Sequence, residues 1–110
     1  MINQTPLREF EKSIDDDLDY GFLFSDWLFD GDAIVSSVWT VPTPLTKRNE
    51  AVNLTPITRC GRVHPANTAT SVFIAGGELD EDYIIVNKIT TAQGRVFVRR
   101  FRLWVINAGS

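Results

Sequence analysis

The 110-residue sequence has one cysteine, one histidine and no long apolar run. A single cysteine, Cys60, cannot close an intrachain disulfide, so packing alone must hold the fold, as in proteins of a reducing compartment. Because no run of about 18 apolar residues exists, the sequence predicts no membrane-spanning helix. The first twelve residues lack an apolar stretch behind a basic start, so we expect no secretory signal.

The same scarcity argues against catalysis, metal binding and cofactors. A zinc site takes four ligands, of which Cys60 and His64 could supply two. The sequence has no P-loop, no glycine-rich dinucleotide motif and no nucleophile elbow. Alternating aspartates from Asp15 to Asp19 imitate a calcium loop, but Gly21 stands one position late and the glutamate at position twelve is missing. We therefore predict no catalytic residue, no metal site and no cofactor.

The formal net charge of −3 conceals a split along the chain. Residues 1–32 carry nine acidic and two basic side chains, a net charge of −7, whereas residues 33–110 carry five acidic and nine basic ones, a net charge of +4. Either the acidic segment lies against the basic remainder of its own fold, or it meets the basic face of a neighbouring copy or partner. The arginines of residues 95–102 do not indicate nucleic-acid binding, because the chain as a whole is acidic.

From Leu18 onward the pattern is typical of β-structure. Short runs rich in β-branched and aromatic residues alternate with turns that contain glycine, proline and aspartate. Residues 83–91 and 95–106, joined by Ala92-Gln93-Gly94, predict a hairpin. The parity of the apolar residues changes within the last strand, which predicts a β-bulge at Arg99-Arg100. The strands that we expect cover residues 19–24, 33–41, 52–55, 70–75, 83–91 and 95–106.

Six or seven short strands without a long helix predict an all-β sandwich of the Greek-key type. Tyr83 follows an acidic turn and opens the strand before the last, as in a tyrosine corner, whose hydroxyl bonds back to the preceding loop. Residues 1–17 are polar and contain Pro6, which predicts an extended N-terminal arm. Trp39 and Trp104 should pack inside. The further core residues that we expect are Ile34, Val72, Ile74, Tyr83, Ile85, Ile89, Phe101, Leu103 and Val105.

The sequence contains more aromatic residues than one small core readily hides: three Trp, two Tyr and seven Phe. Neighbours in a strand face opposite ways, so the rings between residues 22 and 29 should not all be buried. Either some of them form a protein interface, where aromatics are enriched, or the core is two-sided with a few exposed rings. The candidate interface residues are Phe22, Phe24, Trp27, Phe29, Asp15, Asp16, Asp17, Arg99, Arg100 and Arg102.

A series of motifs stands in order between Lys12 and Val105. It comprises Leu18-Asp19-Tyr20-Gly21, Ser25-Asp26-Trp27-Leu28, Gly31-Asp32-Ala33-Ile34-Val35-Ser36-Ser37-Val38-Trp39-Thr40-Val41-Pro42, Val72-Phe73-Ile74-Ala75-Gly76-Gly77, Tyr83-Ile84-Ile85-Val86-Asn87, and Ile89-Thr90-Thr91 before Gly94-Arg95. The series resembles the fiber–tail adaptor proteins, a family of small virion proteins of tailed bacteriophages. The chain departs from the family pattern at Ser13-Ile14, where an Asp-Pro is common, and in a longer, more basic 43–69 region.

The resemblance implies an immunoglobulin-like β-sandwich over residues 18–110, without catalytic residues, behind the arm of residues 1–17. It further implies a structural adaptor that joins fibre and tail components at the tail or the head–tail neck. Its expected partners are fibre, tail or neck proteins and further copies of itself in a ring, with no nucleic acid and no membrane. The expected location is the virion, assembled in the cytoplasm of the host bacterium. The alternative is a free-standing carbohydrate- or surface-binding module, in which exposed aromatics near Trp27 would stack on sugars.

Overall fold

A computed structural model describes residues 8–107, which form strands, turns and loops without a helix. In that part of the chain there is accordingly no helix long and apolar enough to cross a membrane. The strands, in chain order, are β1 (Arg8–Ser13), β2 (Leu18–Leu23), β3 (Ile34–Thr40), β4 (Leu45–Val52), β5 (Ile57–Arg59), β6 (Arg62–His64), β7 (Ala69–Gly76), β8 (Asp82–Thr91) and β9 (Val96–Ile106).

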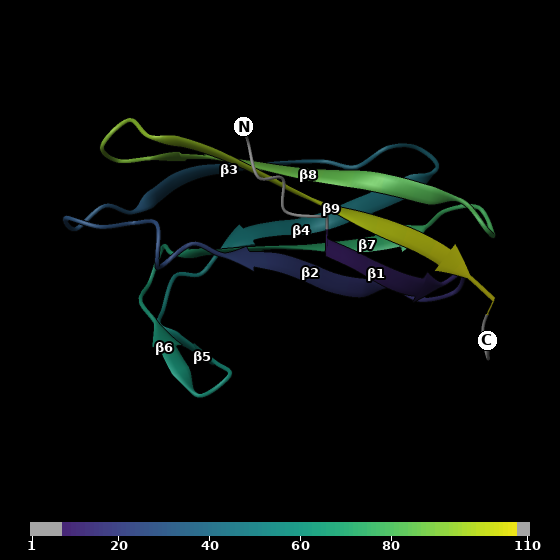
Figure 1. Cartoon of the computed structure of the whole chain (residues 1–110), viewed down its shortest axis with the longest axis horizontal. Helices are drawn as coiled ribbons and strands as arrows, with labels where there is room; N and C mark the ends of the chain where they lie inside the picture. The colour runs from purple at the N-terminus through teal and green to yellow at the C-terminus, as the bar shows by residue number, and fades with distance from the viewer. Residues whose placement is uncertain (1–7, 108–110) are drawn as a thin grey trace, which may run out of the picture.

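Two sheets face each other, and a small hairpin projects from one end (Figure 1). The four-stranded sheet has the order β1-β9-β8-β3, the three-stranded sheet has the order β2-β7-β4, and β5 and β6 form the hairpin. With the hairpin set aside, β2, β7 and β4 match strands B, E and D of an immunoglobulin domain, and β3, β8 and β9 match strands C, F and G. The predicted all-β, immunoglobulin-like sandwich is confirmed.

The core lies between the two sheets and draws side chains from both. Its larger cluster contains Trp39 from β3, Val72 and Ile74 from β7, and Phe101 and Leu103 from β9. Every residue that we expected in the core is buried except two. Tyr83 is half-buried and packs against the larger cluster, whereas Trp104 is 45% exposed and the prediction for it is wrong.

The predicted tyrosine corner is present at the start of β8. The backbone N–H of Glu78 donates a hydrogen bond to the Tyr83 hydroxyl at 3.0 Å. This bond ties the β7–β8 loop to β8, as the sequence pattern predicts. The predicted hairpin of β8 and β9 is also present, with residues 92–95 as its connection.

The predicted bulge at Arg99-Arg100 is wrong. β8 and β9 pair without interruption, from Asp82 opposite Trp104 to Thr90 opposite Val96. β9 keeps one parity throughout, and Val96 and Val98 simply face outward and are exposed. The change of apolar parity therefore marks a strand with two apolar faces, not an inserted residue. The register shifts instead in β3 and in β4.

The N-terminal segment differs from the expected arm. Residues 8–13 form β1, which runs parallel to β9 at the edge of the four-stranded sheet. Phe10 packs edge-on against Phe101, and the fully buried Lys12 donates hydrogen bonds to the carbonyl oxygens of Ser13 and Gly76, both at 2.8 Å. The folded domain thus begins before residue 18, because the free edge of β9 supplies backbone partners. Residues 1–7 of the expected arm lie outside the described residues.

The 42–69 region is more regular than the sequence indicates. The strand expected at residues 52–55 lies earlier, as β4, and ends at Val52. β5 and β6 then form a hairpin around Cys60 and Gly61, which have positive φ angles of 52° and 74°. Two positive φ angles are what a two-residue type I′ turn requires. Cysteine is an unusual residue at the first of these positions, which explains why the sequence did not signal the turn.

Candidate protein-interaction surface

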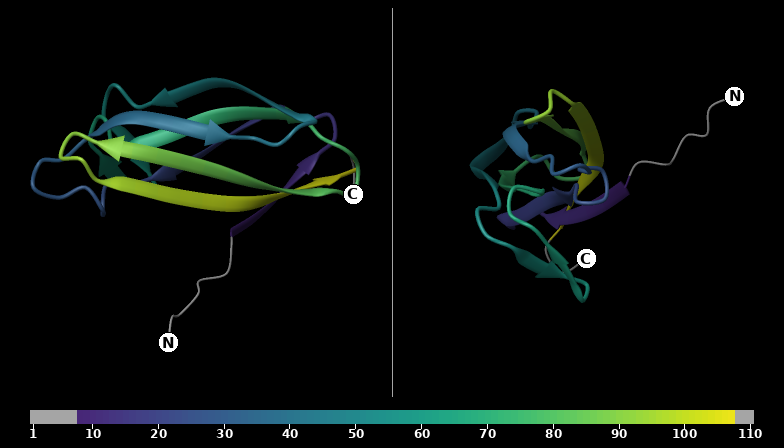
Figure 2. Two further views of the ribbon diagram at one scale, coloured as in Figure 1. Left: turned by 90° about the horizontal axis from the view of Figure 1, so that it is seen from above. Right: turned by 90° about the vertical axis from the view of Figure 1, so that its left-hand side faces the viewer.

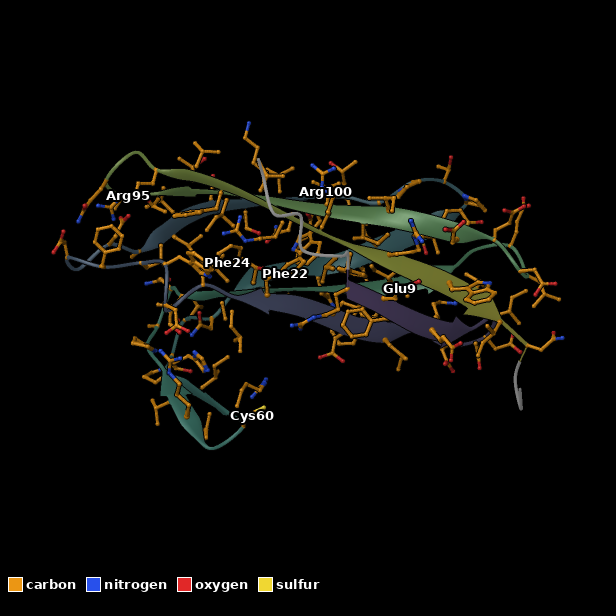
Figure 3. The ribbon with its side chains drawn as sticks, in the orientation of Figure 1. Glu9, Phe22, Phe24, Cys60, Arg95 and Arg100 are labelled. Carbon is orange, nitrogen blue, oxygen red and sulfur yellow. The ribbon has the colours of Figure 1, made fainter. Side chains whose placement is uncertain are left out.

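One end of the sandwich carries two exposed aromatic side chains on the loop between β2 and β3. Trp27 is 51% exposed and Phe29 is 58% exposed. Arg99 lies over the Trp27 ring, 5.0 Å from its centroid, and Arg95 lies over the Phe29 ring at 4.1 Å. Figure 3 shows Arg95 at this end of the molecule. We call Trp27, Phe29, Arg95 and Arg99 the aromatic–arginine end.

The Asp32 carboxylate fixes Arg95 and the neighbouring hairpin. Its side chain is fully buried, accepts hydrogen bonds from the backbone N–H groups of Ala33 at 2.9 Å and Gln93 at 3.0 Å, and pairs with Arg95 at 3.1 Å. Burial alone would raise the pKa of Asp32, but hydrogen bonds from Thr91, Gln93 and Ala33 and the charge of Arg95 outweigh it and lower the pKa. The carboxylate therefore stays ionised and holds the two loops together.

The β5–β6 hairpin supports the same loop from the other side. The buried His64 shares a hydrogen bond of 2.6 Å between its Nδ1 and the Ser25 hydroxyl. Arg62 forms an ion pair with Asp26, and its hydrogen bond and charge lower the pKa of the Asp26 carboxyl. Sequence reasoning missed the contact between Ser25 and His64, because nothing in the local pattern pairs residues 39 positions apart.

The residues that could suggest catalysis do not form a complete site. Cys60 lies at the exposed tip of the hairpin, as Figure 3 shows, whereas His64 is buried at its base. Ser25 and His64 resemble a nucleophile and its base, but within residues 8–107 no side chain donates to or accepts from the second ring nitrogen of His64. In the same part of the chain, no three His, Cys, Asp or Glu side chains gather in a group that could hold a metal ion.

Two of the four aromatic candidates belong to the core instead. Phe24 is 1% exposed, and Phe22 is half-buried and stacks on Trp39 with the ring centroids 5.7 Å apart. Both point between the sheets because they continue the inward parity of β2 that begins with Tyr20. Phe22 and Phe24 are therefore not available as anchors for a partner, whereas Trp27 and Phe29 are.

The three candidate arginines of β9 divide by parity. Arg99 faces inward and covers the aromatic rings of Trp27 and Phe97. Arg102 pairs with Asp82 at 3.3 Å and with Glu9 at 3.9 Å. Arg100 is exposed on the outer side of the four-stranded sheet (Figure 3). The structure therefore does not bring the three into one basic site.

The candidate aspartates also have different surroundings. Asp16 accepts a hydrogen bond from the Ser13 N–H at 3.1 Å, Asp17 pairs with Arg48 at 2.8 Å, and Asp15 is exposed.

Asp17 is one of four acids from residues 1–32 that pair with bases from residues 33–110. The four pairs are Glu9–Arg102, Asp17–Arg48, Asp26–Arg62 and Asp32–Arg95. Of the two explanations for the charge split, contact with the chain's own basic remainder is the one present within the subunit.

A groove of about 440 Å³ lies over the outer face of the three-stranded sheet beside the hairpin. Small residues of the sheet, including Gly21, Ala51 and Ser71, contribute to its lining, together with Ile57 and Cys60 of the hairpin region. Gly21 is required there by the pairing of β2 with β7, because a Cβ atom on it would lie 2.1 Å from the Thr70 carbonyl oxygen. The sequence did not predict the groove because it did not predict the hairpin.

The fold and the surface together define a small immunoglobulin-like sandwich with exposed aromatic, charged and apolar side chains and, among the described residues, no complete catalytic or metal-binding group. Comparison with known protein families matches residues 12–104 to the family described as podophage GP4 fiber-tail adaptor protein gp77. The chain therefore belongs to this family of phage structural proteins, and the resemblance seen in the sequence motifs is confirmed. No curated protein matches the sequence.

Proposed function

We propose that the protein is a non-enzymatic adaptor of the phage virion that joins fibre and tail components at the tail or the head–tail neck. Its partners in this role are fibre, tail or neck proteins, with further copies of itself arranged in a ring. The subunits assemble into the particle in the cytoplasm of the host bacterium. Family membership supports the role of adaptor, and the aromatic–arginine end supplies a surface through which an adaptor could bind.

The observation that carries this proposal is the pairing of exposed rings with fixed arginines. Trp27 and Phe29 keep about half of their surface in water although each is in contact with a guanidinium group. Tryptophan and arginine are enriched among the residues that dominate the affinity of protein interfaces. Asp32 and the hairpin hold the loop in place, so little conformational entropy remains to be lost when a partner binds.

The carbohydrate-binding alternative has less support. A sugar-binding tryptophan offers the flat face of its ring to the ligand, but Arg99 covers one face of Trp27. The groove lies over a different surface, and Trp27 does not line it. An enzymatic role likewise lacks a complete catalytic group among the described residues.

The test replaces both exposed rings, as Trp27→Ala with Phe29→Ala, in a phage that depends on a supplied copy of the gene. We expect at least about a 10-fold loss of incorporation into particles, since anchor residues contribute about 2 kcal/mol or more each. The thermal midpoint should barely change, because both rings are exposed. Trp104→Ala is the matched control, since it removes an exposed tryptophan from the far end of β9. Normal incorporation of the double variant would place the partner surface elsewhere.

A further inference from the structure

Among residues 8–107, no element covers the outer face of the four-stranded sheet. Beyond the Glu9–Arg102–Asp82 group, the part of this face on β3, β8 and the first half of β9 combines apolar with cationic side chains. Val38 and Val98 lie on either side of Lys88 in the cross-strand register, and Arg100 is the next outward residue of β9. The two valines are 54% and 43% exposed. Neither Lys88 nor Arg100 forms an ion pair within residues 8–107. We call Val38, Lys88, Val96, Val98 and Arg100 the cationic sheet face.

A second surface of the same chain has the opposite charge and a similar apolar content. The β1–β2 turn and the β7–β8 loop lie side by side at the end of β9, where the Ile14 N–H bonds to Ile106 at 2.9 Å and the Asp80 N–H bonds to Val105 at 2.8 Å. Two apolar side chains, Ile14 and Leu79, are exposed there. The acids that surround them without an ion pair inside the described chain are Asp15, Glu78, Asp80 and Glu81. These six residues are the acidic end.

The two surfaces face different directions. Figure 2, in its left view, presents the outer side of β3, β8 and β9 to the viewer, and the β7–β8 loop and the β1–β2 turn both lie at the right-hand end. The acidic end of a subunit therefore cannot cover its own cationic sheet face. It can reach that face only on another copy.

We infer that the cationic sheet face of one copy binds the acidic end of a second copy. Each surface has too much charge of one sign to pair with itself, so a symmetric face-to-face dimer is disfavoured. A contact between two different surfaces is head-to-tail, and such contacts build closed rings or open chains. Charge brings the copies together, and burial of Val38 and Val98 against Ile14 and Leu79 stabilises the contact. The inference rests on the proposed function, in which several copies meet in one particle.

The test exchanges charges between the two surfaces in purified full-length protein. One variant combines Lys88→Glu with Arg100→Glu, and the other combines Glu78→Lys with Glu81→Lys. By sedimentation velocity and native mass spectrometry, we expect the wild type to associate with rising concentration and each variant alone to remain monomeric. An equimolar mixture of the two variants should associate again, at least in pairs, because the unchanged cationic sheet face of the second variant then meets the unchanged acidic end of the first.

Two controls keep the result interpretable. Arg8→Glu with Arg59→Glu changes the net charge as much as the first variant but lies outside both surfaces, so it should associate like the wild type. Circular dichroism must show the wild-type spectrum in every variant. Should a charge-reversal variant misfold, the neutral variant of the same surface replaces it and must also reduce association: Lys88→Gln with Arg100→Gln, or Glu78→Gln with Glu81→Gln. A wild type that stays monomeric at about 1 mM, where even a millimolar contact is populated, overturns the inference. So does a mixture that fails to associate.

Two different measurements test the proposed function and this inference: incorporation into particles tests the first, and association of the purified protein tests the second. The Trp27 and Phe29 variant should associate normally as purified protein while incorporating poorly into particles. A charge-reversal variant that remains monomeric and still enters particles in normal amounts would limit the inference to contact in solution and overturn its role in assembly.

Discussion

At the scale of single residues, two tyrosines from the two facing sheets, Tyr20 of β2 and Tyr83 of β8, differ in whether the hydroxyl has a hydrogen-bond partner. The Tyr83 hydroxyl accepts a hydrogen bond from the Glu78 N–H, whereas the Tyr20 hydroxyl is buried and has no partner within residues 8–107. Burial raises the pKa of Tyr20 to about 12, with Asp16 and Asp19 adding to the shift. Both residues pack against the larger core cluster through their rings.

Removing the hydroxyl group should therefore change the free energy of unfolding differently at the two tyrosines. Tyr83→Phe should lower the free energy of unfolding by about 1 kcal/mol, because the Glu78 N–H loses its partner. Tyr20→Phe should leave stability unchanged or raise it, because it removes an unpaired buried hydroxyl. For comparison, Trp39→Ala should cost about 3–5 kcal/mol. Urea unfolding measures all three, and equal effects of the two Tyr→Phe changes would contradict the tyrosine corner.

A second residue-scale prediction concerns Asp32 and pH. The pKa of this carboxyl is lowered below its ordinary value of 3.8 in the folded protein. A lowered pKa means that the unfolded chain binds the proton more tightly, so the contribution of Asp32 to stability is present above pH 4 and disappears as the pH falls through the folded pKa. Asp32→Asn should therefore lower the thermal midpoint at about pH 7. The gap between variant and wild type should narrow below pH 4. A gap that is independent of pH would show that the charge is not what stabilises this end.

At the scale of elements, strand β1 is the clearest departure from the sequence-based expectation. Residues 1–17 contain no strong β-pattern, because β1 has only one buried side chain, Lys12, and its other residues are polar or partly exposed. A sequence pattern cannot show that an edge strand forms because a neighbour offers backbone partners. The strands from β2 onward that have clear apolar runs were predicted to within a few residues. β4 and the hairpin were not, because four prolines mask their pattern.

Truncation distinguishes a strand from an arm. Deleting residues 1–13 removes β1, the contact of Phe10 with Phe101 and the hydrogen bonds of Lys12 to the β7 end. We expect a loss of at least about 2 kcal/mol in the free energy of unfolding, since apolar surface is exposed and several hydrogen bonds are lost. Deleting residues 1–7 is the control, because it keeps the whole of β1. If both truncated proteins unfold at the wild-type urea concentration, β1 contributes nothing to the domain.

At the scale of the whole molecule, the sequence shows the charge split but does not predict which charges pair within the subunit and which remain unpaired. Four acids of the first 32 residues are neutralised within the subunit, and only the folded structure shows which they are. The candidate site divides in the same way: Trp27 and Phe29 are accessible, while Phe22 and Phe24 fill the core. Whether an aromatic residue faces inward depends on where its strand ends, which composition does not reveal. The exposed surfaces that carry the proposals are the aromatic–arginine end, the cationic sheet face and the acidic end.

Salt should affect the stability of the fold and the contact between copies differently. Charges outside the core are screened beyond about 10 Å at 0.1 M salt and beyond about 3 Å at 1 M. The sandwich is held by an apolar core, and its exposed ion pairs contribute about 0–1 kcal/mol each, so its thermal midpoint should change little over this range. The head-to-tail contact depends on Lys88, Arg100 and the acidic end, so self-association should be strongest at about 0.05 M salt and largely lost at about 1 M. Sedimentation velocity across the series, with thermal unfolding on the same samples, measures both. Association that strengthens with salt would assign the contact to the exposed valines alone and remove the charges from it.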